Sequence, residues 1–328
     1  MDGKQKPPKA GVDYPKTMVQ FLDWFHTEQG CRDYLEKLRW PGGKLVCPQC
    51  GVVSPVERIS RARLVCPACK HQATATAGTI FEKTRTDLRA WFVAIWFITS
   101  QKHGASALGL QRILGLGSYQ TAWAMLHRLR RAMVRPEREL LQGRVEIDET
   151  YLALTDRLNP RSPLGRKSGT AKLMVVIAVE MLSPKGFGRI RIRQIERPDH
   201  ASLVSFVQDC VSPMANLHTD GSQTYRIFQQ LGYRLDQTVH LTSGKPAHET
   251  MPGVHRVAAL LQRWMMGTHH GAVQPAQLDY YLDEFVFRFN RRTSNSRGLL
   301  FYRLLQQAVL TAPVTYDDIV ITTETDEI

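Results

Sequence analysis

The amino-acid sequence predicts an α/β fold in which a mixed β-sheet follows a mainly helical first part of the chain. Before Pro136 most apolar residues recur at helical spacing, whereas residues 145–151 and 188–195 alternate apolar and polar side chains with the period of a strand. Residues 172–181 add a β-branched apolar run between those segments. The 328 residues allow about two or three domains.

The first elements expected are two short helices. Residues 1–16 are rich in Pro, Lys and Gly without an apolar period, so we expect a disordered leader. Apolar residues between Met18 and Phe25 then recur at helical spacing, and residues 34–38 repeat the pattern until Pro41 breaks it. Two helices should therefore precede residue 41.

Four cysteines form two C-x-x-C pairs, Cys47 with Cys50 and Cys66 with Cys69, and fifteen residues separate the pairs. Each pair lets two thiolates reach one ion from a tight turn, and two pairs complete a tetrahedral shell with no open position. One pair would leave a redox or disulfide role open, but the second pair and the polar N-terminus argue against both. We expect a zinc ribbon over residues 45–81 that binds structural Zn²⁺.

A helical region is expected after the ribbon. Residues 87–100 are apolar and aromatic, which is typical of a core helix. Residues 105–114, a Gly-rich break and a helix that begins near Tyr119 follow, and this is the pattern of a helix-turn-helix. Such a motif next to a zinc ribbon predicts a nucleic-acid-binding region.

The positive charge is concentrated in this first part of the chain. The net charge is +13, and residues 1–142 carry 22 Lys and Arg against 11 Asp and Glu. So local an excess favours a phosphate-backbone partner. The second helix of the motif ends in a basic run, from which we predict that Arg128, Arg130 and Arg131 contact double-stranded DNA. A solvated basic face is the alternative.

The second part begins with three strands, over residues 145–151, 172–181 and 188–195, which we expect to form an antiparallel meander. The elements expected next are a helix at 201–211, a strand at 216–219, a helix near 224–231, a strand at 236–241, and helices from Pro252 and Gln277. The order βββαβαβα is that of a ribonuclease-H-like fold. Residues 155–170, rich in Pro, Gly and Arg, should form a flexible loop.

Two aspartates stand out in this order. Asp148 lies in the middle of a strand, where Asp is depleted, and Asp220 ends a later strand. An aspartate before glycine is usually a turn residue, but the fold would place the first and fourth strands side by side with both carboxylates at one site. Such a pair would bind hard divalent cations and leave room for phosphate oxygens.

The chain resembles the zinc-ribbon DDE transposases of bacterial insertion sequences, the insertion-sequence 1595-type family with an ISXO-like transposase domain. The four-cysteine ribbon carries part of the likeness. The other segments that carry it are residues 38–41, 78–81, 118–123, 145–151, 219–221, 267–269, 281–285 and 288–292. They lie between about residues 18 and 305, which is nearly the whole chain.

The resemblance implies that Asp148 and Asp220 are the first two acids of the catalytic triad and bind catalytic Mg²⁺ or Mn²⁺. It places His255 at the third metal-ligand position and Gln262 at the position of the family's lysine, seven residues later on the same helix face. Both differ from the usual residues, an acid or amide and a lysine. Glu249 as the third ligand, or an impaired site, are the alternatives.

The resemblance further implies a transposase that binds terminal inverted repeats and catalyses metal-dependent strand cleavage and strand transfer, as a homodimer or larger assembly on DNA. A decayed or repurposed zinc-dependent DNA-binding protein is the alternative. The apolar runs are too short to cross a membrane, so we expect a cytoplasmic protein. The expected segments are a disordered leader at 1–16, N-terminal helices and zinc ribbon at 17–81, a DNA-binding region at 82–142, a catalytic domain at 143–312 and an acidic tail at 313–328.

Overall fold

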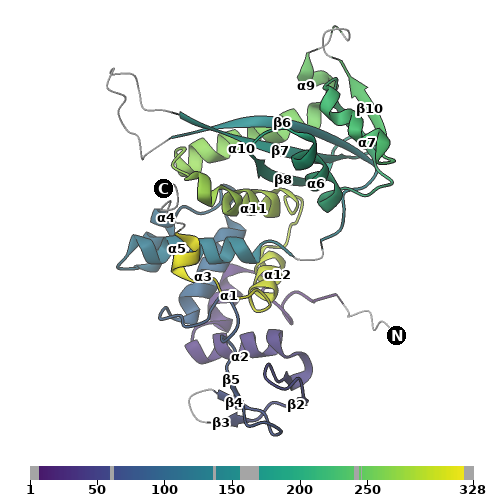
Figure 1. Ribbon diagram of the computed structural model, residues 1–328. Coiled ribbons are helices and arrows are strands. Elements are labelled where there is room, and N and C mark those ends of the chain that lie inside the picture. Colours follow the sequence, from purple (N-terminus) through teal and green to yellow (C-terminus); the bar gives the residue numbers. More distant parts are fainter. Residues whose placement is uncertain are drawn as a thin grey trace, which may run out of the picture. The chain divides into compact units, whose positions relative to one another are not determined.

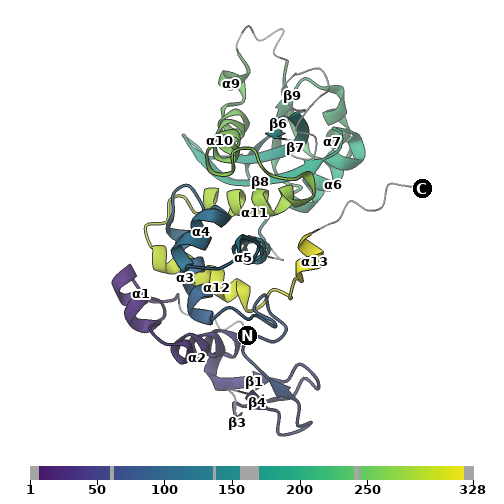
Figure 2. The ribbon, with the colours of Figure 1, turned by 90° about the vertical axis from the view of Figure 1, so that its left-hand side faces the viewer.

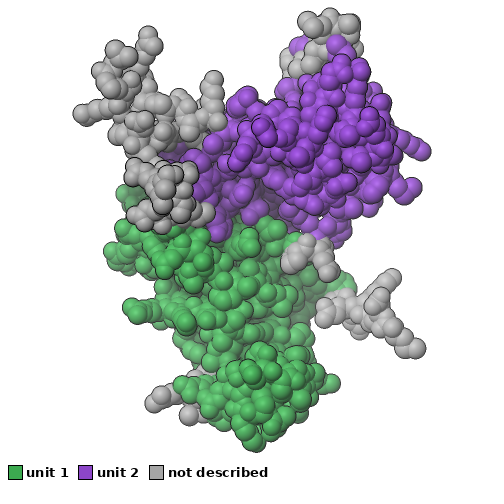
Figure 3. All heavy atoms as spheres, in the orientation of Figure 1, with its two compact units in different colours: residues 1–135, 294–328 green, residues 136–293 purple. Residues whose placement is uncertain are grey.

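The computed structural model of the protein describes residues 7–59, 63–135, 138–155, 170–239, 244 and 246–320. They divide into two compact units, unit 1 with residues 1–135 and 294–328 and unit 2 with residues 136–293 (Figure 3). Four expectations lie partly outside the described residues. These are the leader at 1–6, the loop at 156–169, the end of the last strand at 240–241 and the acidic tail at 321–328.

Unit 1 is mainly helical, as the apolar spacing predicts. Its helices are α1 (Met18–Trp24), α2 (Glu28–Arg39), η1 (Pro41–Gly43), α3 (Leu88–Ser100), α4 (Ala107–Leu114), α5 (Tyr119–Ala132), α12 (Arg297–Ala308) and α13 (Tyr316–Ile319). Rings from α1, α3 and α12, together with Phe25, form an aromatic core with neighbouring centroids 4.8–5.7 Å apart. The aromatic helix α3 is therefore a core helix, as predicted.

Helix α12 belongs to unit 1, whereas the sequence suggested a catalytic domain that continues to residue 312. The reason is packing, because Phe301, Leu304 and Leu305 of α12 are fully buried and α12 makes its main helix contact with α3. The boundary of the second unit is therefore corrected to residue 293. Hydrophobic spacing shows that a helix buries one face but not which partner covers it.

The N-terminal segment at residues 7–16 also packs onto unit 1, although it was expected within the disordered leader. Tyr14 is 6 % exposed, and a Cβ atom added to Gly298 would lie 1.7 Å from the Pro15 carbonyl oxygen. Only glycine permits so close an approach of two backbones. The expectation of disorder is corrected for this segment.

Unit 2 contains a five-stranded mixed sheet. Its strands are β6 (Arg144–Thr155), β7 (Thr170–Met181), β8 (Phe187–Ile195), β9 (Asn216–Asp220) and β10 (Arg234–Thr238), in the order β10-β9-β6-β7-β8. The first three form the predicted antiparallel meander. Strand β9 pairs in parallel with both β6 and β10. The first and fourth strands of the unit are thus neighbours, as predicted.

Helices cover both faces of this sheet (Figures 1 and 2). One face packs on α10 (Pro252–His269) and α11 (Leu278–Phe289), and the other on α6 (His200–Cys210) and the segment of η3 (Gln223–Arg226) and α7 (Ile227–Gln230). The remaining short elements are α9 (Ala247–Thr250) and η4 (Pro275–Gln277). No helix among the described residues combines the length and apolar character needed to cross a membrane.

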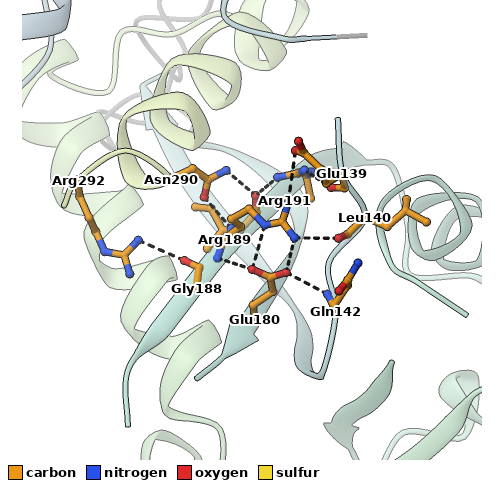
Figure 4. A network of polar contacts seen from close by, with 10 residues as sticks. Glu139, Leu140, Gln142, Glu180, Gly188, Arg189, Arg191, Asn290 and Arg292 are labelled. Carbon is orange, nitrogen blue, oxygen red and sulfur yellow. Dashed lines mark hydrogen bonds and ion pairs between the residues drawn. The ribbon is translucent and has the colours of Figure 1, made fainter. Parts of the chain in front are cut away.

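A polar network fixes the beginning of unit 2 to its edge strand (Figure 4). Arg189 of β8 donates to both carboxylate oxygens of Glu180 and to the Leu140 carbonyl. Arg191, two residues further along the strand, donates to the Glu139 carbonyl at 2.7 Å and is 4 % exposed. These arginines hold the segment that enters the sheet at β6.

Candidate active site and metal centre

The four cysteines of the ribbon converge on one point. Five short strands, β1 (Lys44–Val46), β2 (Val53–Pro55), β3 (Arg58–Ile59), β4 (Arg63–Val65) and β5 (Gln72–Ala73), carry the two C-x-x-C turns. All four sulfur atoms lie within 4.8 Å of one another, with Cys47 and Cys69 3.6 Å apart and Cys50 and Cys66 3.7 Å apart. A tetrahedral ion with bonds of about 2.3 Å requires sulfur separations of about 3.8 Å. The donor set fits structural zinc.

The two cysteine turns have the same backbone design. The first cysteine of each pair accepts a hydrogen bond from the fourth residue after it, Gly51 in one turn and Lys70 in the other, both at 2.9 Å. Both of these residues adopt a left-handed backbone, with φ of 72° and 60°. Glycine adopts this conformation readily and lysine does not, so the second turn is held against a local preference by the neighbouring strands, and a bound zinc ion would hold it further.

Asp148 and Asp220 lie on adjacent parallel strands. The last pair in the register of these strands is Glu146 of β6 with His218 of β9, and Asp148 and Asp220 each follow that pair by two residues. Val145 and Ile147 face the core beneath α6, and therefore Glu146 and Asp148 point to the α10 side of the sheet. Both aspartates are half-buried. The structure thus brings the two predicted acids to one place.

The electrostatics of this place suit a cation. Burial raises the pKa of Asp148 to about 7, and the nearby carboxylates of Glu149, Asp220 and Glu146 add to this shift. Burial also raises the pKa of Glu149, whose Oε1 accepts a hydrogen bond from the Tyr225 hydroxyl at 2.7 Å. Neighbouring carboxylates repel one another when ionised, and a bound divalent cation would offset this repulsion.

Backbone contacts hold Asp220 in position. Its Oδ1 accepts a hydrogen bond from the Ser222 backbone N–H at 3.0 Å. The Gln237 side chain, on β10, donates to the carbonyl oxygens of Asp220 and Ser222 at 3.1 and 3.0 Å. The turn after β9 is therefore tied to the neighbouring strand.

Helix α10 carries the two remaining predicted residues. His255 lies in its first turns and is half-buried, and Gln262 donates from Nε2 to the Tyr151 carbonyl of β6 at 3.2 Å. Glu249, the alternative third ligand, is exposed on α9. Within the described part of the chain, only the four cysteines form a group of three or more metal-ligand side chains within 4.8 Å of one another. His255 lies on the helix that contacts β6, but it does not form a compact cluster with Asp148 and Asp220. It therefore remains a predicted ligand.

The prediction of a DNA contact by Arg130 is corrected. Its side chain is 1 % exposed, with Nη1 3.5 Å from the His127 ring. Arg128 is half-buried and donates to the Val314 carbonyl, and burial lowers its pKa. Arg131 is exposed. The basic run looked like one charged face, but α5 packs against α3, α4, α12 and α13, so that most of its surface is inside unit 1.

Three polar residues of the site were not predicted. Glu146 and Glu149 lie on β6 on either side of Asp148, Tyr225 donates a hydrogen bond to Glu149, and Glu146 and Tyr225 are each 1 % exposed. A signal was present for the two glutamates, since a strand segment with three acids among its apolar residues is unusual. Nothing in the sequence indicates the partner of Tyr225.

Comparisons with known proteins agree with this architecture. The ISXO2-like transposase domain matches residues 140–290, and the transposase zinc-ribbon domain matches residues 26–72. An uncharacterised protein in transposable element ISH50 of Halobacterium salinarum is 26 % identical over 282 residues, which cover 80 % of this chain and 91 % of that protein. Together the two domain matches cover more than half of the 328 residues. The chain belongs to the family of insertion-sequence transposases that combine a transposase zinc ribbon with an ISXO2-like transposase domain.

Proposed function

We propose that this protein is a DDE-type transposase that binds the terminal inverted repeats of its element and catalyses metal-dependent strand cleavage and strand transfer. The observation that carries the proposal is that Asp148 and Asp220 each follow the last pair of two adjacent parallel strands by two residues, and that the Asp220 carboxylate is near enough to raise the pKa of Asp148. The sheet order β8-β7-β6-β9-β10, with a three-stranded meander followed by two parallel strands, supports a ribonuclease-H-like catalytic domain.

In this proposal Asp148 and Asp220 provide oxygen ligands for Mg²⁺ or Mn²⁺. The bound ions would supply positive charge that activates the attacking oxygen and stabilises the negative charge that develops on the phosphate oxygens. His255 is the third ligand, because it projects from the first turns of the helix that contacts β6. Gln262 can donate a hydrogen bond to DNA from an exposed position, but it cannot neutralise a phosphate as lysine does.

Unit 1 would provide DNA binding through the ribbon and the N-terminal end of α5. Tyr119 and Gln120 are exposed there, and the first residues of the second helix are those that reach base edges in a helix-turn-helix. Beside them lies a groove of about 270 Å³ in which Lys83, Arg85 and Arg128 are the charged lining residues. None of the described residues that line the groove is acidic, so its charge suits a phosphate backbone. We expect two or more copies to act on paired DNA ends.

The experiment is cleavage of a labelled DNA fragment that contains the element end, with Mg²⁺ or Mn²⁺. The wild-type protein should cut at the element boundary, and Asp220→Asn should lose several orders of magnitude in rate because an amide cannot hold the ion. Asp209→Asn is a matched control in the same unit, since Asp209 is exposed and pairs only with Arg193 in the contacts seen. Equal cleavage by all three proteins would refute the proposal.

The second candidate is a DNA-binding protein without catalytic activity. His255 and Gln262 favour it, because they stand where the family usually has an acid or amide and a lysine. Binding of the element end without cleavage under either ion would support this candidate. The two candidates therefore differ in cleavage and not in binding.

A further inference from the structure

A buried carboxylate holds the start of helix α10 against the strand that carries Asp148. Glu146 Oε2 accepts hydrogen bonds from the backbone N–H groups of Gly253 and Val254, at 2.7 and 3.1 Å. These are two of the first N–H groups of the helix, which have no partner inside it. Glu146 is 1 % exposed, so the contact is sheltered from water.

The close fit depends on the absence of a side chain at Gly253. A Cβ atom there would lie 2.7 Å from Glu146 Oε2 and 2.6 Å from Met181 Sδ. The first turn of α10 therefore rests directly on β6 and β7. Because Glu146 Oε2 accepts hydrogen bonds from the helix backbone, we do not count Glu146 among the metal ligands.

The environment of Glu146 leaves it little freedom. Its other oxygen is 4.0 Å from His218 Nδ1, and that ring lies between the Arg144 guanidinium at 2.9 Å and the Thr238 hydroxyl at 2.9 Å. His218 is 2 % exposed. The contact from β6 to α10 is thus supported from β9 and β10 as well.

Helix α10 touches β6 at two levels, and His255 lies between them. Gly253 is held at Glu146, and Gln262 donates to Tyr151. A helix rises about 1.5 Å per residue and a strand about 3.3 Å. Two helical residues beyond Gly253 therefore correspond to about one strand residue beyond Glu146, and this places His255 near the level of Ile147, about one strand residue before Asp148.

We infer that Glu146 is a positioning residue, which fixes the height and rotation of α10 and so places His255 relative to Asp148 and Asp220. This inference rests on the proposed function for its catalytic consequence. The function of Glu146 is to accept two hydrogen bonds at a fixed distance from the strand. The reach of the side chain matters, and its negative charge does not.

Two variants separate reach from charge. Glu146→Gln keeps a hydrogen-bond-accepting oxygen at the same distance from the strand but removes the negative charge. Glu146→Asp keeps the negative charge but shortens the side chain by one methylene group. Glu180→Asp is the matched control, because Glu180 is also a buried, hydrogen-bonded carboxylate of this sheet, on β7, but it contacts Arg189 instead of α10. All variants are compared as zinc-loaded full-length protein under conditions in which each is folded.

Three measurements are made on each variant. They are backbone hydrogen exchange in a peptide that covers the start of α10, Mn²⁺ affinity, and cleavage of the element end. Glu146→Asp should exchange faster at the start of α10 and lose about 10–100-fold in Mn²⁺ affinity and in cleavage, the usual effect of removing a residue that orients a metal ligand. Glu146→Gln and Glu180→Asp should stay within about threefold of wild type.

A larger impairment in Glu146→Gln than in Glu146→Asp would overturn the inference, because it would show that Glu146 acts through its negative charge. Unchanged exchange and affinity in Glu146→Asp would overturn it as well. If the wild-type protein neither binds Mn²⁺ through Asp148 nor cuts DNA, the proposed function fails, whereas the exchange measurement still decides whether Glu146 holds α10.

Discussion

Replacing Arg189 by methionine should destabilise unit 2 substantially. Arg189 donates to both oxygens of Glu180, at 2.8 and 3.1 Å, and Glu180 is 8 % exposed. Breaking a buried ion pair costs about 3–5 kcal/mol, because the remaining charge loses its partner. The Arg189 side chain is 32 % exposed, and Glu180 keeps hydrogen bonds from two backbone N–H groups, at Gln142 and at residue 189 itself. We therefore expect a loss of about 2–3 kcal/mol.

The loss should depend on pH with a definite sign. Burial alone would raise the pKa of Glu180, but hydrogen bonds from Arg189 hold it below its ordinary value of 4.5. A carboxyl group with a lowered pKa stabilises the fold above that ordinary value, and this stabilisation disappears as the pH falls through the folded pKa. The difference between the two proteins should therefore be largest at neutral pH and shrink below about 4.5.

The assay is urea unfolding of the full-length protein, followed by a probe in unit 2, at several pH values. Arg197→Met is the control, since Arg197 forms an exposed pair with Asp199 and should cost less than about 1 kcal/mol. A cost for Arg189→Met no greater than that of the control would refute the reasoning. So would a difference that grows as the pH falls.

Three other predictions concern unit 1. Replacing Lys83 and Arg85 by alanine should weaken binding to the element end and reduce the slope of log affinity against log salt by about 1.8, whereas Arg303→Gln, exposed on α12, should leave the slope unchanged. Gly298→Ala should lower the free energy of unfolding by about 3 kcal/mol or more, because its Cβ would overlap the Pro15 carbonyl; a wild-type urea midpoint would contradict this packing. Removing zinc should unfold the ribbon and abolish DNA binding, since metal binding of about 10 kcal/mol or more supplies its folding energy; unchanged affinity after chelation would contradict it.

Local patterns allowed much of the fold to be predicted. The spacing of Cys47, Cys50, Cys66 and Cys69 determines a four-sulfur site, because each short turn can present its thiolates in few ways. The period-two strands and the order of elements predicted the meander and the neighbouring positions of β6 and β9. Asp148 and Asp220 could be paired from that order alone.

Features that depend on distant partners could not be predicted. The burial of Arg130 follows from helices packed around α5, and the place of α12 follows from its contact with α3. The role of Glu146 depends on a backbone contact with residue 253, which is 107 positions away in the sequence. Sequence spacing describes the face that a residue occupies, but not the group that meets it there.

The most direct test of the central claim is the rate of strand cleavage at the element end by Asp148→Asn and wild-type protein, with DNA binding and zinc content measured on the same samples. Asparagine keeps the shape of the side chain and loses its charge, so the variant should bind the DNA and retain zinc but cut several orders of magnitude more slowly with Mg²⁺ and with Mn²⁺. Cleavage by Asp148→Asn at the wild-type rate would show that the carboxylates on β6 and β9 are not the catalytic metal site.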